Sequence, residues 1–89
     1  MITLFISSKC PECPEAVQSF KASELNYKTV DITESMDNLR LFLKYRDSNS
    51  FFDNIKSLNQ VGIPSIMIGD GKSFISYKSS LDLSKLKEE

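Results

Sequence analysis

Two cysteines separated by two residues are the side chains of this sequence best suited to chemistry. Cys10 and Cys13 lie in the segment SSKCPECP, with a proline and a glutamate between them. A pair of thiols at this spacing can form and open a disulfide, and the thiolate is the nucleophile in that exchange. Two other interpretations stay open at this point: half of a metal site, and two reduced core cysteines that lie close together.

Composition limits the side chains that could act together with this cysteine pair. The sequence contains no histidine, which removes the commonest general base and the commonest metal ligand. A structural zinc site takes four ligands, so carboxylates would have to complete one around the two thiols, and we expect no metal. The net charge is -1 and the lysines are scattered among acids, so we expect neither nucleic acid nor an anionic membrane as a partner.

Length and hydropathy predict one domain over residues 1–89, monomeric by default. The apolar runs are too short to cross a bilayer. The opening residues MITLFIS lack the basic leader of a secretory signal, so we expect a cytoplasmic protein. Cytoplasmic thiols are kept reduced, and a close cysteine pair in that compartment is more often catalytic or metal-binding than a structural staple.

The elements around the pair predict how the two cysteines differ. Residues 2–7 are an apolar β-branched run typical of a buried strand, and residues 11–23 have helical periodicity. The pair therefore lies where a strand passes into a helix, whose free N–H groups and positive end stabilise a thiolate. We expect Cys10 to be exposed and to attack, and Cys13 to be buried in the first turn and to resolve the mixed disulfide.

The rest of the chain predicts further helices. Residues 34–47 form the longest helical pattern, capped by Ser35. Its apolar stripe consists of Met36, Leu39, Phe42 and Leu43. Residues 51–58 predict a short helix with Leu58 facing inward. The final segment, residues 79–89, predicts another helix, capped by Ser79 or Ser80.

The strands complete an α/β fold. Residues 25–33 predict a strand near the sheet edge, and residues 62–77 predict two strands joined by a turn at Gly69-Asp70-Gly71. The order is β-α-β-α-β-β-α. A helix joins the first two strands, which should therefore be parallel, whereas the closing hairpin is antiparallel. We expect a mixed four-stranded sheet with helices on both faces.

Together these features resemble glutaredoxin over nearly the whole chain. The resemblance is carried by CPEC after the first strand, by Gly62-Ile63-Pro64 before the Gly-Asp-Gly hairpin, and by the order of the elements. The segments FLKYRDSNSFFDNIK and VGIPSIMIGDG are also similar to a bacterial branch of small glutaredoxin-related proteins. The resemblance implies a thioredoxin-like fold of the glutaredoxin type.

The resemblance also implies an activity. It implies a thiol–disulfide oxidoreductase that reduces protein disulfides or glutathione mixed disulfides, with electrons from glutathione or from a dedicated reductase and no required cofactor. Pro64 would be a cis proline that faces Cys10 and shapes the groove, and the Ile63 backbone would pair with a bound peptide or glutathione. Two alternatives remain: a non-catalytic peptide-binding module of the same fold, and a carrier of a metal or cluster.

Near the cysteines, the chain departs from the family pattern. Glu12 replaces a tyrosine, and Ser7 occupies the position of a basic residue three places before the first cysteine. The nearest lysine is Lys9, which either stabilises the thiolate or is simply solvated. Like-charge repulsion from Glu12 should disfavour a thiolate at Cys10, with Lys9 partly offsetting this effect.

The C-terminal departures concern glutathione. The resemblance puts Lys78-Ser79 where the family has two glycines, and it retains Asp82 from an acidic pair that closes the glutathione pocket. We therefore expect weakened or altered glutathione recognition, with Asp82 either binding glutathione or only capping the last helix. Arg46 is a further residue that could reach a substrate carboxylate.

Overall fold

The chain folds around a mixed four-stranded sheet. The computed structural model describes residues 1–86. The strands are β1 (Ile2–Ile6), β2 (Tyr27–Asp31), β3 (Ser65–Ile68) and β4 (Ser73–Ser76), arranged in the order β2-β1-β3-β4. β1 runs parallel to β2 and antiparallel to β3, and β3 pairs antiparallel with β4. The predicted parallel pair, the closing hairpin and the edge position of the second strand are confirmed.

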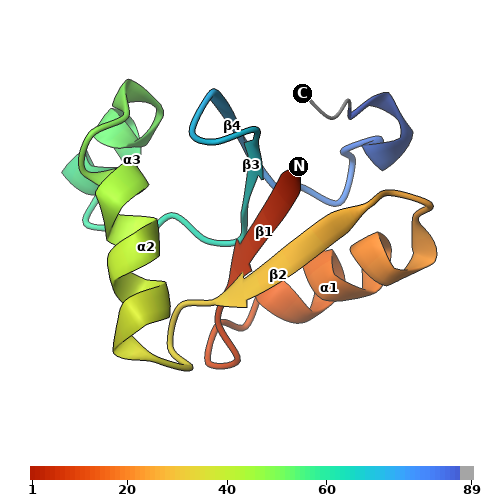
Figure 1. Ribbon diagram of the computed structural model, residues 1–89, viewed down its shortest axis with the longest axis horizontal. Helices are drawn as coiled ribbons and strands as arrows, with labels where there is room; N and C mark the ends of the chain where they lie inside the picture. The colour runs from red at the N-terminus through yellow and green to blue at the C-terminus, as the bar shows by residue number, and fades with distance from the viewer. Residues whose placement is uncertain (87–89) are drawn as a thin grey trace.

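Helical segments cover both faces of the sheet (Figure 1). They are α1 (Cys13–Ala22), α2 (Met36–Arg46), the 3-10 turn η1 (Ser50–Phe52), α3 (Asp53–Ser57) and the 3-10 turn η2 (Leu83–Lys85). In Figure 1, α2 and α3 lie on one side of the sheet, and α1 with the C-terminal turn lies on the other. The architecture is the expected thioredoxin-like α/β fold.

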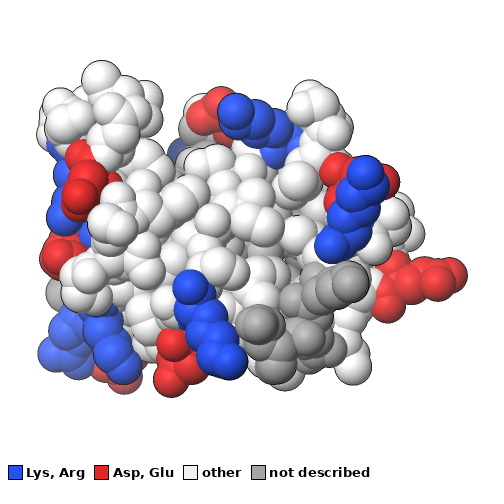
Figure 2. Space-filling view, turned by 90° about the horizontal axis from the view of Figure 1, so that it is seen from above, with Lys and Arg blue, Asp and Glu red and all other residues white. Residues whose placement is uncertain are grey.

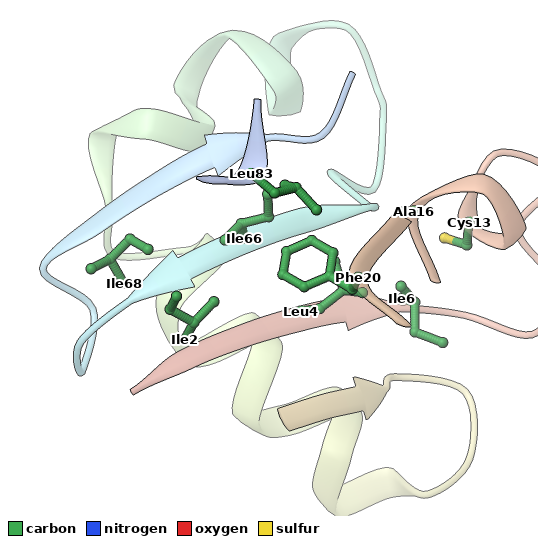
Figure 3. Packing of buried hydrophobic residues seen from close by; sticks show 9 residues of the cluster. All are labelled: Ile2, Leu4, Ile6, Cys13, Ala16, Phe20, Ile66, Ile68 and Leu83. Atoms are coloured by element: carbon green, nitrogen blue, oxygen red, sulfur yellow. The ribbon is translucent and has the colours of Figure 1, made fainter. Parts of the chain in front are cut away.

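The central strand β1 supplies side chains to two separate cores. All five of its residues are buried, because neighbouring strands flank it and helices cover both of its faces. Alternate side chains of a strand point to opposite faces. One face carries a cluster that ends at Cys13 (Figure 3). Its buried members are Ile2, Leu4, Ile6, Cys13, Ala16, Phe20, Ile66, Ile68 and Leu83. The first residue of α1 is therefore fixed by the packing of the helix on the sheet.

The opposite face is packed by aromatic rings. Phe5 of β1 lies against Phe42 of α2, with ring centroids 5.1 Å apart. Phe52 of η1 contacts both Phe42 and Phe74 edge-on, at centroid distances of 5.8 and 5.0 Å. Offset and edge-on pairs of this kind contribute beyond the area they bury. They fix α2 and the η1–α3 segment against the sheet.

Helix ends agree in part with the sequence. The predicted cap of α2 is confirmed, since the Asn38 N–H donates to Ser35 Oγ at 3.1 Å. The predicted last helix is wrong over the described residues, where a single 3-10 turn, Leu83–Lys85, takes its place. Asp82, and not a serine, caps this turn by accepting from the Ser84 N–H at 3.0 Å. Residues 87–89 of the predicted helix lie outside the described residues.

Two apolar residues predicted to face inward are exposed. Met36 is 69% exposed because it is the first residue of α2, directly after the cap, where the helix has not yet reached the core. Leu58 is 59% exposed because α3 ends at Ser57, so this side chain does not continue the helix face. Phe42 of the same stripe is fully buried.

The surface carries charges of both signs. Figure 2 shows lysine, arginine, aspartate and glutamate side chains interspersed around a largely uncharged centre. No single-sign field extends over the described residues visible on this face. Within residues 1–86, no helix is long and apolar enough to span a membrane.

Candidate active site

The two cysteines lie at the junction of β1 and α1, in different environments. The helix begins at Cys13, two residues later than predicted, so Cys10 lies in the preceding loop. A tight turn shapes this loop, with the Cys10 N–H donating to the Ser7 carbonyl at 3.1 Å and the Cys13 N–H to the Cys10 carbonyl at 3.3 Å. Cys10 is partly exposed, whereas Cys13 is only 1% exposed. The expected difference in exposure is confirmed.

The start of α1 places charge close to the pair. Pro14 stands in the first turn, where a missing N–H costs nothing, and Glu15 adds the acidic residue that the helix dipole favours. Glu12 occupies the N-cap position, but its side chain makes no capping hydrogen bond. Its carboxylate is exposed and lines the cavity at Cys10. Glu12 is therefore positioned to act on the chemistry and does not stabilise the helix as a cap.

Burial holds Cys13 in its protonated form. The pKa of the Cys13 thiol is raised to about 12, chiefly by desolvation and next by a hydrogen bond to the Cys10 sulfur. The Glu12 carboxylate contributes in the same direction, while the Ser7 backbone opposes it. At neutral pH, Cys13 is thus a thiol whose proton faces the Cys10 sulfur. A thiol in this position can stabilise a thiolate on its neighbour by donating a hydrogen bond.

The loop that carries Cys10 is tied to the end of β2. Ser7 Oγ lies 2.7 Å from Thr33 Oγ1 and accepts from the Lys9 N–H at 3.0 Å. Asp31 accepts from the Ser8 N–H at 3.2 Å and from the Thr33 hydroxyl at 2.8 Å. The hydrogen bonds from Thr33 lower the pKa of Asp31. This network fixes the backbone just before the exposed cysteine.

Sequence reasoning missed Asp31 and Thr33, although a signal for them exists. β1 and β2 are parallel, so residues that follow their carboxyl ends meet at one edge of the sheet. Ile6 pairs with Asp31 in the register, and the Ile32 N–H donates to the Ile6 carbonyl at 2.9 Å. Polar residues directly after the second strand were therefore candidates for contact with the cysteine loop.

A groove of about 700 Å³ runs past Cys10. Four of the predicted site residues line it together: Lys9, Cys10, Ile63 and Pro64. The Ile63–Pro64 peptide bond is cis, as predicted. Within the described chain, the Ile63 N–H and carbonyl make no hydrogen bond, whereas the Pro64 carbonyl accepts from the Tyr77 N–H at 3.3 Å. An open backbone pair thus lines the same groove as the exposed cysteine.

Lys9 lies at the groove with its side chain exposed. No ion pair joins it to a carboxylate among residues 1–86. An exposed ammonium beside a reactive sulfur attracts negative charge only modestly, because water screens it. The two interpretations from the sequence, a role at the thiolate and simple solvation, both fit this placement.

Asp82 is not brought to Cys10. Its carboxylate accepts from the Ser84 N–H and, at 2.6 Å, from the Ser84 hydroxyl, and it is not among the residues that line the groove. The structure thus matches the capping interpretation, and the glutathione-binding role implied by the resemblance stays a prediction. The C-terminal residues that line the groove are Ser76, Tyr77 and Lys78, so only Lys78 of the two residues aligned with the family's glycines is among them.

Tyr77 is a third residue at the site that the sequence did not single out. It follows β4 and lines the groove, and its hydroxyl lies 2.7 Å from Ser19 Oγ of α1. The same hydroxyl lies 3.3 Å from a carboxylate oxygen of Glu15. Tyr77 therefore joins the end of the sheet to the helix that begins at Cys13. No local sequence pattern announces such a contact between distant segments.

Metal-ligating groups are sparse in the described chain. Over residues 1–86, no cluster of three or more histidine, cysteine, aspartate or glutamate side chains could hold an ion.

Comparisons with known proteins agree with this geometry. The family model described as Glutaredoxin matches residues 2–74. A protein of Haemophilus influenzae, itself described as uncharacterized, is 36% identical over 84 residues, which covers 94% of this chain and 91% of that protein. No solved structure gives a significant match.

Proposed function

This chain belongs to the glutaredoxin family, and from that premise we propose that it is a thiol–disulfide oxidoreductase that reduces protein disulfides or glutathione mixed disulfides. One observation carries the proposal: a partly exposed Cys10 lies in an open groove beside a buried, protonated Cys13. The first is accessible to a substrate disulfide, and the second is shielded from it but lies next to the first.

The reaction divides between the two sulfurs. The Cys10 thiolate attacks one sulfur of the substrate disulfide, a new S–S bond forms, and the other substrate sulfur leaves as a thiolate. Cys13 then gives up its proton, which the departed thiolate can accept, and attacks the Cys10 sulfur of the mixed disulfide. The bond between Cys10 and the substrate breaks, and the second substrate sulfur leaves as a thiolate that takes a proton from water. The products are a Cys10–Cys13 disulfide and a substrate reduced by two electrons. Two thiols of glutathione, or a dedicated reductase, return the two electrons.

The groove supports a substrate in extended form. The unpaired N–H and carbonyl of Ile63 can bond to the backbone of a peptide beside the disulfide, as a strand pairs with a sheet edge. Pro64 follows directly and lines the same groove. In this proposal the dithiol is the whole redox centre, with no further cofactor, and the protein acts as a monomer in the cytoplasm.

The proposal is tested by the disulfide reduction rate of the purified protein. With glutathione or a thioredoxin-type reductase as donor, wild-type protein should reduce a peptide disulfide, and Cys10→Ser should not. Cys13→Ser should accumulate a mixed disulfide on Cys10, seen as a mass increase that dithiothreitol removes. Absence of reduction with both donors would refute the enzyme, and an adduct on Cys13 of the Cys10→Ser variant alone would refute the assigned roles.

A further inference from the structure

Arg46 is bound to the backbone on the far side of the groove. It is the last residue of α2. Its Nε donates to the Val61 carbonyl and its Nη2 to the Gln60 carbonyl, both at 2.7 Å. Nη1 lies 3.5 Å from the Asp47 carboxylate. The side chain is only 20% exposed. Because its guanidinium is engaged in these contacts, Arg46 does not present a free guanidinium to a substrate carboxylate, as the sequence had suggested it could.

The segment that Arg46 holds makes few other polar contacts. It is the groove wall, defined here as Gln60–Pro64, all of which line the groove with Cys10. The Gln60 N–H donates to the Ile55 carbonyl at 3.1 Å. From there to the Pro64 carbonyl, within the described chain, the wall makes no backbone hydrogen bond, and Val61 is 53% exposed. The two bonds from Arg46 are thus its main polar attachment.

Apolar contacts support the wall on its core side, where Ile63 packs against both hydrophobic clusters. Gly62 has a φ of +106°, and a side chain there would lie 3.1 Å from the Phe52 ring. The backbone therefore approaches this ring closely, but nothing in that contact sets its orientation. Two charge-assisted bonds from one planar guanidinium do set it, because they fix two successive carbonyls at once. The apolar contacts thus hold the wall close to the core, and the two bonds from Arg46 fix the direction of its carbonyl groups.

The anchor at the other end is rigid. Phe42 of α2 is fully buried between Phe5 and Phe52. A cation in the last turn of a helix is also stabilised by the helix dipole. Arg46 thus ties the wall, which lines the groove with Cys10, to a helix that is fixed in the core.

We propose that Arg46 is a positioning residue for substrate binding, which holds Gln60 and Val61 so that the Ile63 backbone meets a substrate peptide beside Cys10. This inference rests on the proposed function for its kinetic consequence. Its structural part, that Arg46 orders the wall, stands independently. Arg46 touches neither the substrate nor the sulfurs, so its loss should weaken peptide binding and leave the thiol chemistry intact.

The kinetic test compares Arg46→Ala and Arg46→Lys with Arg40→Ala. Arg40 is a matched control because it lies on the same helix but is 72% exposed and, among the described side chains, pairs only with Asp37. For a peptide disulfide, Arg46→Ala should raise KM roughly tenfold at unchanged kcat, since misplacing a binding segment weakens its contacts. Arg46→Lys should raise it only about threefold, because one ammonium can replace one of the two bonds. Attack on hydroxyethyl disulfide, which is too small to need the wall, should be unchanged.

The structural test is amide hydrogen exchange at Val61, Gly62 and Ile63 by NMR. Exchange should accelerate at least about tenfold in Arg46→Ala and stay normal in Arg40→Ala. Unchanged exchange would overturn the proposal, as would an equal loss of rate with hydroxyethyl disulfide. If wild-type protein reduces no disulfide, the proposed function fails, and the exchange comparison still decides whether Arg46 orders the wall. Should Arg46→Ala not fold, Arg46→Lys carries both measurements.

Discussion

Ser7 Oγ and Thr33 Oγ1 lie 2.7 Å apart and join the loop after β1 to the loop after β2. The contact occurs directly before the exposed cysteine, since the Lys9 N–H donates to the same Ser7 oxygen. It occupies the position where the family resemblance leads one to expect a basic residue. At this place the chain thus uses a hydrogen-bond network that ends at the Asp31 carboxylate, where a basic side chain was expected, and the network fixes the loop.

The first prediction concerns this network. Thr33→Val should destabilise the protein by about 1 kcal/mol, because it leaves Ser7 and Asp31 without one partner each. Thr33 lowers the pKa of Asp31, so this carboxylate contributes stability above its unfolded pKa that is lost as pH falls through the folded value. The acid-induced loss of stability should therefore be smaller in Thr33→Val. Urea unfolding at neutral and acid pH measures both effects.

Thr29→Val is the control for this prediction. Thr29 lies on the edge strand β2, which ends two residues before Thr33; it is exposed, and no hydrogen bond of its side chain is seen in the described chain. The β-branched replacement suits a strand equally well. Equal behaviour of the two variants on acidification would show that the Ser7–Thr33–Asp31 network has no energetic role.

The second prediction concerns Ser65, the first residue of β3. Its hydroxyl is buried and, among the described residues, has no hydrogen-bond partner. A buried polar group without a partner costs about 1–3 kcal/mol relative to its hydrated state. Ser65→Ala should accordingly be neutral to stabilising, by up to about 1 kcal/mol, in urea unfolding. Ser76→Ala, at the paired but exposed position of β4, should change little. A clear loss of stability in Ser65→Ala would reveal a hidden partner for the hydroxyl.

Features of this fold that are set by neighbouring residues could be predicted from the sequence more reliably than those set by contacts between distant segments. The strand before Cys10, the cap at Ser35 and the hairpin at Gly69–Gly71 rest on neighbouring residues, and all three are present. The cis bond before Pro64 was implied by the family resemblance and is also present. These features follow from local chemistry or from a short motif that can be recognised directly in the sequence.

The errors lie where distant segments decide the outcome. Tyr77 reaches Ser19, and Arg46 reaches Val61, across separations that no periodicity encodes. Asp82 fits a family position by alignment, yet a single 3-10 turn replaces the expected helix and engages its carboxylate locally. Met36 follows the apolar stripe but precedes the point at which α2 meets the core. Such outcomes depend on tertiary packing, which a pattern within one segment does not contain.

The third prediction concerns Glu12, whose carboxylate lines the groove without capping α1. Glu12→Tyr removes a negative charge beside the attacking sulfur. Alkylation of Cys10 by iodoacetamide at neutral pH should accelerate about two- to threefold, the size expected for a charge interaction in a water-exposed site. Glu15→Gln is the control, because this carboxylate faces the Tyr77 hydroxyl. An unchanged or slower rate in Glu12→Tyr would show that the Glu12 carboxylate points away from Cys10.

The last prediction concerns alkaline pH and Cys13. Burial raises the pKa of this thiol from 9.0 to about 12, so between these values the folded state keeps a proton that the unfolded state releases. The stability contributed by this group is therefore complete below its unfolded pKa and is lost as pH rises toward the folded value. Cys13→Ala should be less stable than wild type at neutral pH, because it leaves a small cavity. Its stability should nevertheless fall less than that of wild type, by about 2 kcal/mol, between about pH 8.5 and about pH 10.5.

Urea unfolding under a phosphine reductant measures this difference, and contributions from groups common to both proteins cancel. Cys10→Ala is the matched control for Cys13. It removes the neighbouring sulfur but retains the burial of Cys13, which is the largest cause of the raised pKa. Its alkaline loss of stability should therefore resemble that of wild type. Parallel curves for Cys13→Ala and wild type would mean that Cys13 ionises as freely in the folded protein as in the unfolded chain. A bound proton would then not protect the Cys13 thiol from reaction, and only its burial would keep a substrate disulfide away from it.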